Sequence, residues 1–399
     1  MSATYASEDG LSALLMPTYA PAPVCFVEGH GSRLIDSEGR SYLDFLSGIA
    51  VTSLGHSHPV LAEAVCEQAR RLWHVSNLVT NELSPKVAAE LDRLVGNGQP
   101  AGGRVFFANS GAEANECAIK LARKAGGHNR YEVVSAYNSF HGRTLATLHA
   151  TGQPEKHEPF QPLPEGFRHV PFGDIAELAR VADPTTVAAV LLEPIQGEGG
   201  VVPAPAGYLT EVRRLCDERG ILLVLDEIQT GLGRTGSWFA FHEEGVLPDV
   251  VTVAKSLGNG MPIGACWARR EIADVFAPGD HGSTFGGQPL ACSAALATLL
   301  ELQRIDAPSL ARAAGERLRN ALAALPAISG VRGRGLLLGA VLDADGRHAH
   351  RAREAVRSAL LAGLVLNAPT ADTIRLAPPL IVSEDEVDEA VSILAEVLA

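Results

Sequence analysis

Residues 221–264 read ILLVLDEIQTGLGRTGSWFAFHEEGVLPDVVTVAKSLGNGMPIG, a stretch in which two short apolar runs each end in a charged residue. The run Ile221–Leu225 ends at Asp226, and the run Val250–Ala254 ends at Lys255. Uninterrupted runs of valine, isoleucine and leucine between turn residues are typical of strands buried on both faces, as in a parallel sheet. Because ligands of such sheets bind beyond the carboxyl ends of the strands, we expect Asp226 and Lys255 to face one crevice from neighbouring strands.

A carboxylate and an amine in a largely apolar crevice are each costly to desolvate without a partner. Pyridoxal phosphate (PLP) would provide a partner for both, since its aldehyde condenses with a lysine amine and its protonated ring nitrogen pairs with a carboxylate. The protonated ring then stabilises a carbanion. The alternative is a plain ion pair between two strand ends, and on these two residues alone that is the simpler interpretation.

Length and composition restrict the class of protein. The 399 residues, 46% hydrophobic and 20% charged, suffice for a large core and predict two domains. With a formal net charge of −13 and no basic block, neither nucleic acid nor a membrane surface is an expected partner. No apolar run reaches the roughly 18–20 residues of a transmembrane helix, and no Cys/His cluster has metal-ligand spacing. The scattered cysteines and the absence of Lys or Arg before Arg33 predict a reducing, cytoplasmic location.

The order strand, turn, helix recurs from residue 104 to residue 268, which predicts a doubly wound, largely parallel sheet. The predicted strand Arg104–Ala108 leads into NSGAEANE and a helix. Free backbone N–H groups at a helix start make Ser110, Gly111 and Ala112 a candidate phosphate site, and an ordinary serine-capped turn is the alternative.

Further candidates follow other predicted strands. Phe140 could stack on a planar ring, or simply pack in the core, and Arg143 could hold a carboxylate, or remain a solvated loop charge. Glu198 belongs to a glycine-rich turn after the strand Val187–Leu192. In the predicted second domain, where Val331–Leu342 has a strand pattern, Arg375 lies within an apolar strand, and such an arginine usually has a partner anion.

Six motifs in order resemble those of the class III, fold-type I aminotransferases, which depend on PLP: NSGAEANE, FHGRT, EPIQGEGG, LDEIQTGLGRTG, VAKSLGNGMPIGA and HGSTFGGQPLA. The match is densest from residue 104 to residue 291. The resemblance implies an α/β fold with a mostly parallel sheet and a smaller α+β domain built from both chain ends. It divides the chain into an arm and part of the small domain (1–54), a large PLP-binding domain (55–302) and the rest of the small domain (303–399).

The resemblance also implies a cofactor site made of Ser110, Gly111, Ala112, Phe140, Asp226, Gln229, Lys255 and Thr284. Lys255 would bind the cofactor as an imine and move the proton, while Asp226 would pair with the ring nitrogen. Phe140 would stack on the ring and Gln229 would bond its phenolic oxygen. Thr284 would reach the phosphate across the interface of a homodimer with shared active sites.

Four substrate-binding residues follow from the same resemblance: Arg143, Glu198, Ser283 and Arg375. Arg143 would hold the carboxylate remote from the reacting carbon, Arg375 the α-carboxylate of glutamate, and Glu198 would cover Arg375 for substrates without that group. The implied reaction is ping-pong transamination of N2-acetylornithine with 2-oxoglutarate, and succinylornithine, ornithine and 4-aminobutyrate are alternative donors. A PLP aminomutase or decarboxylase, or a non-catalytic binding protein on this fold, remain further alternatives. The departures from the common pattern are Ala112, Gln288 and Val79, and the last bears on substrate choice.

Overall fold

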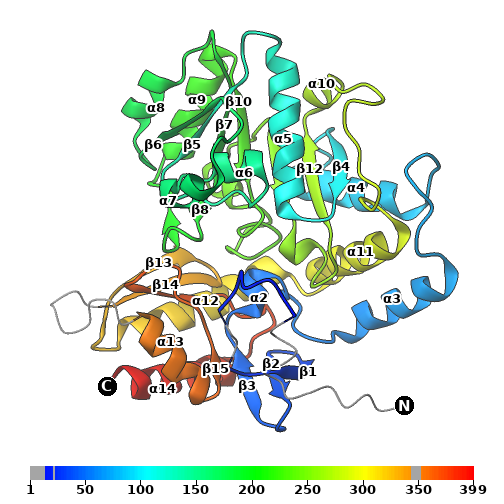
Figure 1. Ribbon diagram of the computed structural model, residues 1–399. Helices are drawn as coiled ribbons and strands as arrows, with labels where there is room; N and C mark the ends of the chain where they lie inside the picture. Colours follow the sequence, from blue (N-terminus) through cyan, green and yellow to red (C-terminus); the bar gives the residue numbers. More distant parts are fainter. Residues whose placement is uncertain (1–13, 21–22, 343–351) are drawn as a thin grey trace.

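The computed structural model describes residues 14–20, 23–342 and 352–399 of the chain. Figure 1 shows two parts, an upper part built around a large sheet and a lower part that combines early strands with the last helices. No helix within the described ranges is both long enough and apolar enough to cross a membrane.

The central sheet has seven strands in the order β4–β12–β11–β10–β7–β5–β6. In that order they are Arg104–Ala108, Gly264–Ala268, Val250–Val253, Leu222–Asp226, Val187–Leu192, Glu132–Ala136 and Phe167–Val170. Neighbouring strands pair in parallel except β12, which is antiparallel to both β11 and β4. The predicted doubly wound, mostly parallel sheet is confirmed, and β10 and β11 are neighbours as expected.

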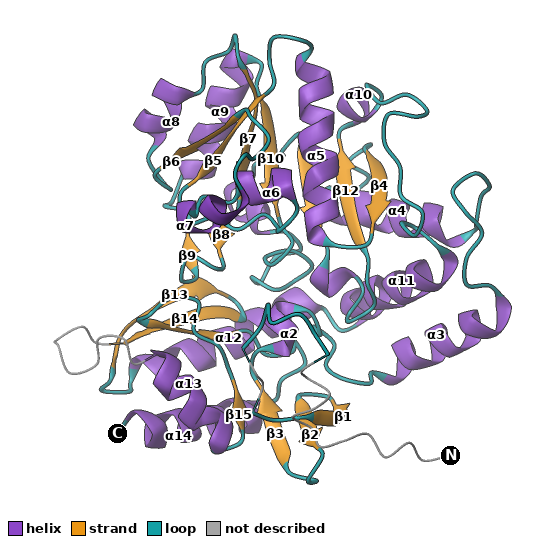
Figure 2. Ribbon diagram, viewed as in Figure 1, coloured by secondary structure: helices purple, strands orange, loops and turns teal. Residues whose placement is uncertain are grey.

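Helices lie on both faces of this sheet (Figure 2), because its central strands are apolar on both sides. Leu223 and Leu225 of β10 belong to one core cluster with Val212 of α9 (Tyr208–Arg219). Val224, whose side chain points the opposite way, belongs to another cluster with Leu121 of α5 (Gly111–Gly126). The other α-helices here are α3 (Pro59–Arg71), α4 (Leu83–Val95), α6 (Leu145–Ala150), α7 (Pro154–His157), α8 (Ile175–Val181), α10 (Arg270–Ala273) and α11 (Pro289–Arg304).

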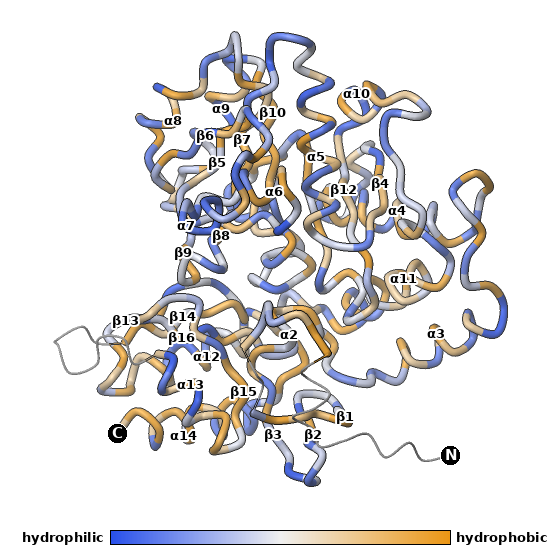
Figure 3. Tube along the Cα trace, viewed as in Figure 1, coloured by the Kyte–Doolittle hydropathy of each residue, from blue (hydrophilic) through white to orange (hydrophobic). Residues whose placement is uncertain are grey.

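Helix α11 follows the glycine-rich loop 281–288 and is hydrophobic along most of its length (Figure 3). Its Leu299 and Leu302 are fully buried, and the helix packs against α3 and α4. The shorter elements of the upper part are the hairpin β8 (Ile195–Gln196) and β9 (Val202–Pro203) and the 3₁₀ helices η1 (Glu158–Phe160), η2 (Ala240–Glu244) and η3 (Lys255–Leu257).

The lower part joins segments that are far apart in the sequence. Strands β1 (Phe26–His30), β2 (Arg33–Asp36) and β3 (Ser41–Asp44) form a sheet with β15 (Leu364–Val365), which pairs in parallel with β3. A second sheet contains β13 (Ile328–Arg334), β14 (Leu337–Leu342) and β16 (Thr373–Leu376). The helices are α2 (Ser47–Ala50), α12 (Ala307–Ala323), α13 (Ala352–Leu361) and α14 (Glu384–Leu398). The predicted α+β domain built from both chain ends is confirmed.

One detail of this part differs from the sequence-based prediction. Val331–Leu342 is not a single strand, because β13 and β14 form an antiparallel hairpin that turns at Gly335. Gly335 has φ +53°, and a Cβ there would lie 2.7 Å from the carbonyl oxygen of Arg234, so the turn needs glycine. The boundaries 1–54, 55–302 and 303–399 stay predictions, and residues 1–13 lie outside the described ranges.

Candidate functional site

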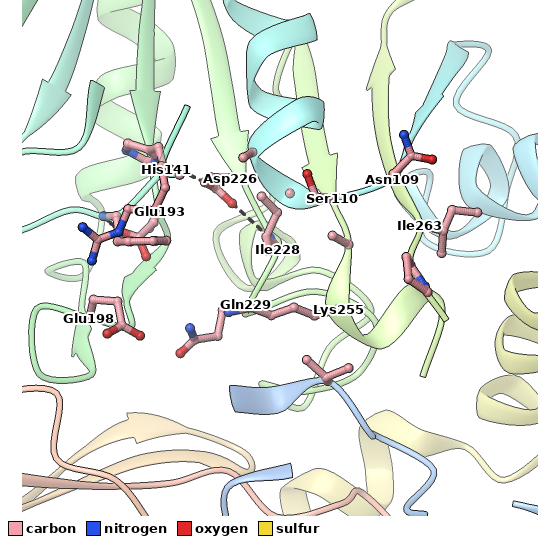
Figure 4. A pocket seen from close by; sticks show the side chains of 18 of the residues that line it. Asn109, Ser110, His141, Glu193, Glu198, Asp226, Ile228, Gln229, Lys255 and Ile263 are labelled. Atoms are coloured by element: carbon pink, nitrogen blue, oxygen red, sulfur yellow. Dashed lines mark hydrogen bonds and ion pairs between the residues drawn. The ribbon is translucent and has the colours of Figure 1, made fainter. Parts of the chain in front are cut away.

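A cavity of about 410 Å³ opens beyond the carboxyl ends of β10 and β11. It brings together most of the predicted site residues: Ser110, Gly111, Ala112, Phe140, Arg143, Glu198, Asp226, Gln229 and Lys255. Figure 4 shows Asp226 and Lys255 on opposite sides of this space, with Ser110 and Gln229 beside them. The prediction that Asp226 and Lys255 face one crevice from neighbouring strands is therefore confirmed.

Asp226 is the last residue of β10, and its carboxylate has three hydrogen-bond partners. Its Oδ2 lies 2.8 Å from Nδ2 of Asn115 and 2.8 Å from Nδ1 of His141, and its Oδ1 accepts from the backbone N–H of Ile228 at 3.1 Å. Asn115 is itself fixed, because its Oδ1 accepts from the Thr252 hydroxyl at 2.7 Å. The carboxylate thus has one orientation at the wall of the cavity, and it can hold a cation or an N–H group there.

Lys255 begins the 3₁₀ helix η3, separated by one residue from the end of β11, and its backbone has φ +41°. A left-handed conformation is uncommon for a lysine, so the turn is specified by the surrounding structure. The pKa of Lys255 is lowered to about 8, mainly by burial and then by the nearby charge of Arg375, against the opposing effect of Glu198, Asp226 and Glu193. The amine therefore exchanges its proton near neutral pH, as an attacking amine or a general base requires.

The start of α5 forms another wall of the cavity. Ser110 is its N-cap, and the Ser110 hydroxyl accepts from the Glu113 N–H at 3.2 Å. Because the first bond of the helix runs from Ala114 N–H to Ser110 C=O, the N–H groups of Gly111 and Ala112 have no helical acceptor. Gly111 lets the helix start lie close to Ile228, since a Cβ there would lie 2.7 Å from the Ile228 Cδ1 and that side chain would have to shift. The helix start can bind an anion such as a phosphate.

Arg375, in β16 of the lower part, is completely buried and is not among the residues that line the cavity, but it contacts two that are, Glu198 and Gln229. One guanidinium nitrogen donates to Glu198 at 2.6 Å and to Gln229 at 3.2 Å, and Nε donates to Asn367 at 3.0 Å. The predicted partner anion is confirmed as Glu198. The other nitrogen, Nη2, has no partner among the described residues, so this cation retains capacity for a further acceptor.

The aromatic and cationic side of the cavity is formed by Phe140 and Arg143. The Arg143 guanidinium carbon lies 5.5 Å from the centre of the Phe140 ring, within cation–π distance. Arg143 is exposed, and no ion pair joins it to a described residue. Its place on the cavity wall is consistent with the predicted contact to a substrate carboxylate.

Ser283 and Thr284 do not line the cavity that contains Lys255. They belong to a separate hollow with His281 and Phe285, where the Ser283 hydroxyl accepts from the Asn109 amide at 3.2 Å. Within one chain these two residues are therefore separated from the other predicted site residues. Their predicted roles, which require a second subunit, remain predictions.

Three residues of the site make contacts that the sequence did not predict. Asn115 and His141 orient Asp226, and Glu193 contacts the backbone N–H groups of Phe140 and Gly197 at 3.0 and 3.2 Å. Burial raises the pKa of Glu193 to about 7. The sequence could have indicated Glu193, because it directly follows a buried strand. Nothing in the sequence indicates the contact between Asp226 and a histidine 85 positions earlier.

A carboxylate, an amine and a helix start around one cavity of a mostly parallel sheet define an enzyme that handles a small anionic molecule. The model of the family "Aminotransferase class-III" matches residues 15–398, and the chain belongs to this family. This confirms the resemblance drawn from the six motifs. The chain is thus an aminotransferase whose substrates are small amino and oxo acids.

Among curated proteins, the chain is similar to the acetylornithine aminotransferase of Gloeobacter violaceus, with 51% identity over 395 residues and 96% of each chain covered. It is 49% identical to that of Corynebacterium efficiens over 404 residues, covering 98% of this chain and 97% of the relative. Among solved structures, N-acetylornithine aminotransferase from Stenotrophomonas maltophilia has a TM-score of 0.82 and 38% identity, with 94% and 96% covered. An ornithine aminotransferase from Toxoplasma gondii, with PLP at partial occupancy in its active site, has a TM-score of 0.91 and 33% identity, with 98% and 94% covered.

Proposed function

We propose that this aminotransferase transfers the δ-amino group of N2-acetyl-L-ornithine to 2-oxoglutarate, giving N-acetylglutamate 5-semialdehyde and glutamate, with PLP as its cofactor. The observation that carries the proposal is the placement of the Lys255 amine and the Asp226 carboxylate on one cavity, beside the open helix start at Gly111. The names of the curated relatives at 49–51% identity support the choice of substrate.

The residues around the cavity fit PLP. Asp226, fixed by Asn115 and His141, would hold the pyridine nitrogen in its protonated form. The N–H groups of Gly111 and Ala112, which have no helical acceptor, would bind the phosphate, and Phe140, which lines the cavity, would stack on the ring. When bound, the cofactor would supply an electron sink that stabilises negative charge on the carbon next to the reacting nitrogen.

Lys255 would move the proton in this reaction. Its pKa of about 8 leaves part of the amine neutral near neutral pH, so Nζ can accept a proton from the amine-bearing carbon of the donor. The same Nζ can then return the proton in the next step of the transfer. Asp226 stays in place throughout, because its three contacts come from separate elements. Gln229, which lines the cavity from the loop after β10, would bond the phenolic oxygen of the cofactor.

Arg375 and Glu198 would let one cavity accept two kinds of substrate. With a donor that has no carboxylate near the reacting carbon, Glu198 would keep its 2.6 Å contact and neutralise Arg375. With glutamate or 2-oxoglutarate, the α-carboxylate would replace Glu198, and Nη2 would provide the second bond of a bidentate pair. Arg143 would bind the remote carboxylate of either substrate.

We further propose a cytoplasmic homodimer in which Thr284, with Ser283 beside it, completes the site of the partner subunit. The exposed apolar residues near the 281–288 loop, Trp73, Leu78, Val79 and Phe285, support such an interface. Asn77 donates to the carbonyls of Ser283 and Gly286, and Gln288 bonds Val75 and Asn77, so the loop and the 72–79 segment would enter the interface together.

The test is a half-reaction screen of the PLP-loaded enzyme, in which the change in cofactor absorbance is followed with N-acetylornithine, N-succinylornithine, ornithine and 4-aminobutyrate. The proposal requires the highest kcat/KM with N-acetylornithine and turnover that depends on 2-oxoglutarate. A preference for ornithine would favour the alternative suggested by the Toxoplasma structure. Turnover without 2-oxoglutarate would favour a mutase or decarboxylase, and failure to bind PLP would favour a binding protein.

A further inference from the structure

Lys156 is a cation near Phe140, one of the residues that line the cavity. It belongs to the short helix α7 and is only partly buried. Its Nζ lies 5.9 Å from the centre of the Phe140 ring, and the Arg143 guanidinium carbon lies 5.5 Å from the same ring. Two cations from different segments of the chain thus approach one aromatic side chain on the cavity wall.

These two cations are not neutralised by the described part of the protein. Nζ of Lys156 donates to the side-chain oxygen of Gln153, which is uncharged, and no ion pair joins Lys156 or Arg143 to a described carboxylate. The carboxylates that act on Lys156 are Glu155, which is exposed, and Glu198, which is already bound to Arg375. Burial lowers the pKa of Lys156, and the charge of Arg143 lowers it further.

Holding two like charges close together costs free energy unless an anion lies between them. A carboxylate there would remove the repulsion and gain a charge-assisted hydrogen bond from each cation. The carboxylate of N-acetylornithine is remote from its reacting δ-amine, and so is the γ-carboxylate of 2-oxoglutarate from its keto carbon. Arg143 lines the cavity with Lys255, so this side of the cavity can receive such a remote group.

We propose that Lys156 acts with Arg143 to bind the substrate carboxylate remote from the reacting carbon, and that it thereby sets the preference for carboxylate-bearing ω-amines. The inference rests on the proposed aminotransferase function and adds a specificity residue to it. Because Lys156 also lies near the Phe140 ring, the alternative is that it only supports that ring. The experiment must distinguish carboxylate binding from this structural role.

The experiment compares the PLP-loaded wild type with Lys156→Met and Lys156→Arg. Each enzyme is tested in the half-reaction with N-acetylornithine and with N-acetylputrescine, which is the same molecule without the carboxylate. We expect Lys156→Met to raise KM for N-acetylornithine about tenfold with little change in kcat, because one charge-assisted bond is lost. The kcat/KM for N-acetylputrescine should change less than about twofold, and Lys156→Arg should restore most of the N-acetylornithine KM.

Lys86→Met is the matched control, because Lys86 is an exposed lysine of α4 that forms a surface pair with Glu82. Lys86→Met should leave KM and kcat unchanged with both donors. Equal losses with both donors in Lys156→Met, or loss of bound PLP, would assign Lys156 to support of Phe140 and overturn the proposal. An unchanged KM for N-acetylornithine would overturn it as well.

A binding measurement separates this inference from the proposed reaction. Glutarate carries two carboxylates and no reacting group, so calorimetry with the loaded enzyme reports carboxylate binding without turnover. We expect its Kd to be about tenfold weaker in Lys156→Met and unchanged in Lys86→Met. If the wild type does not transaminate N-acetylornithine, the proposed substrate is wrong, whereas an unchanged glutarate Kd in Lys156→Met contradicts the role of Lys156 itself.

Discussion

Two arginines, Arg375 and Arg234, are completely buried, and they are satisfied in different ways. Arg375 pairs with Glu198, a side chain that lines the cavity and retains 27% exposure. Arg234 contacts no carboxylate of the described residues: it donates to the backbone carbonyls of Leu336 and Pro378 and to the Ser53 hydroxyl. Each guanidinium keeps one nitrogen without a partner among the described residues.

These two kinds of contact determine what each cation can do. Backbone carbonyls cannot leave, so Arg234 joins the lower part to the loop after β10 permanently, and burial lowers its pKa to about 9. The Ser53 hydroxyl continues the connection to Ser256 at 2.6 Å, directly beside Lys255. Glu198, in contrast, can be replaced by a substrate carboxylate. The fixed contacts of Arg234 and the exchangeable Arg375–Glu198 pair therefore both lie at the boundary between the two parts.

The largest expected effect is on the exchangeable pair. Arg375→Met should lower kcat/KM for 2-oxoglutarate about a hundred- to thousandfold, because both bonds of a bidentate charged pair are lost. The half-reaction with N-acetylornithine should fall less than about fivefold, since no substrate carboxylate meets Arg375 there. Stopped-flow measurement of the two half-reactions checks this split, and equal losses in both would contradict an exchangeable role.

The next effect is on the fixed joint. Arg234→Met should lower the free energy of unfolding by about 3 kcal/mol, because two buried carbonyls and a hydroxyl lose their donor. Urea unfolding followed by circular dichroism measures this, with Arg214→Met as the control, since Arg214 is exposed and forms a surface pair. In the folded fraction, the ratio of the kcat/KM values of the two half-reactions should equal that of the wild type. A shift no larger than that of the control would show that Arg234 is not a structural joint.

A smaller effect is expected when only the charge of Glu198 is removed. Glu198→Gln should lower kcat/KM for N-acetylornithine about tenfold, because Arg375 is then left without a counter-charge beside a neutral substrate end. The half-reaction with 2-oxoglutarate should change less than about threefold. Glu155→Gln is a suitable control, as it removes an exposed carboxylate nearby. If both half-reactions fell equally, Glu198 would not be the group that is exchanged.

The same comparison explains how much the sequence could predict. Asp226 and Lys255 were found because each directly follows a buried apolar run, and a strand fixes where its last residue points. Arg375 was found because an arginine among apolar strand residues is unusual enough to require an anion. Local patterns therefore sufficed wherever a site residue is placed by the element that carries it.

Arg234 shows why other features could not be predicted. Its sequence context, GLGRTG, is a glycine-rich loop, and nothing in it indicates complete burial. The burial arises from carbonyls at residues 336 and 378, more than 100 positions away, which only the assembled fold brings together. The split of Val331–Leu342 into a hairpin has the same origin, because its turn at Gly335 packs against the backbone of Arg234.

The smallest expected effect concerns the proton on Lys255 in the enzyme without cofactor. Burial lowers this pKa to about 8, and Arg375 is the next cause, whereas Arg234 is not among the causes. Because the folded-state pKa lies below the unfolded value of 10.5, protonation favours the unfolded chain, so this group's contribution to stability rises with pH between about 8 and 10.5. Arg375→Met should move the titration midpoint of Lys255 upward and narrow that range, while Arg234→Met should leave the midpoint unchanged. Nuclear magnetic resonance of ¹⁵N-lysine can follow it, since the chain has only five lysines. An equal shift in both variants would mean that the two arginines act on Lys255 only through the general stability of the fold.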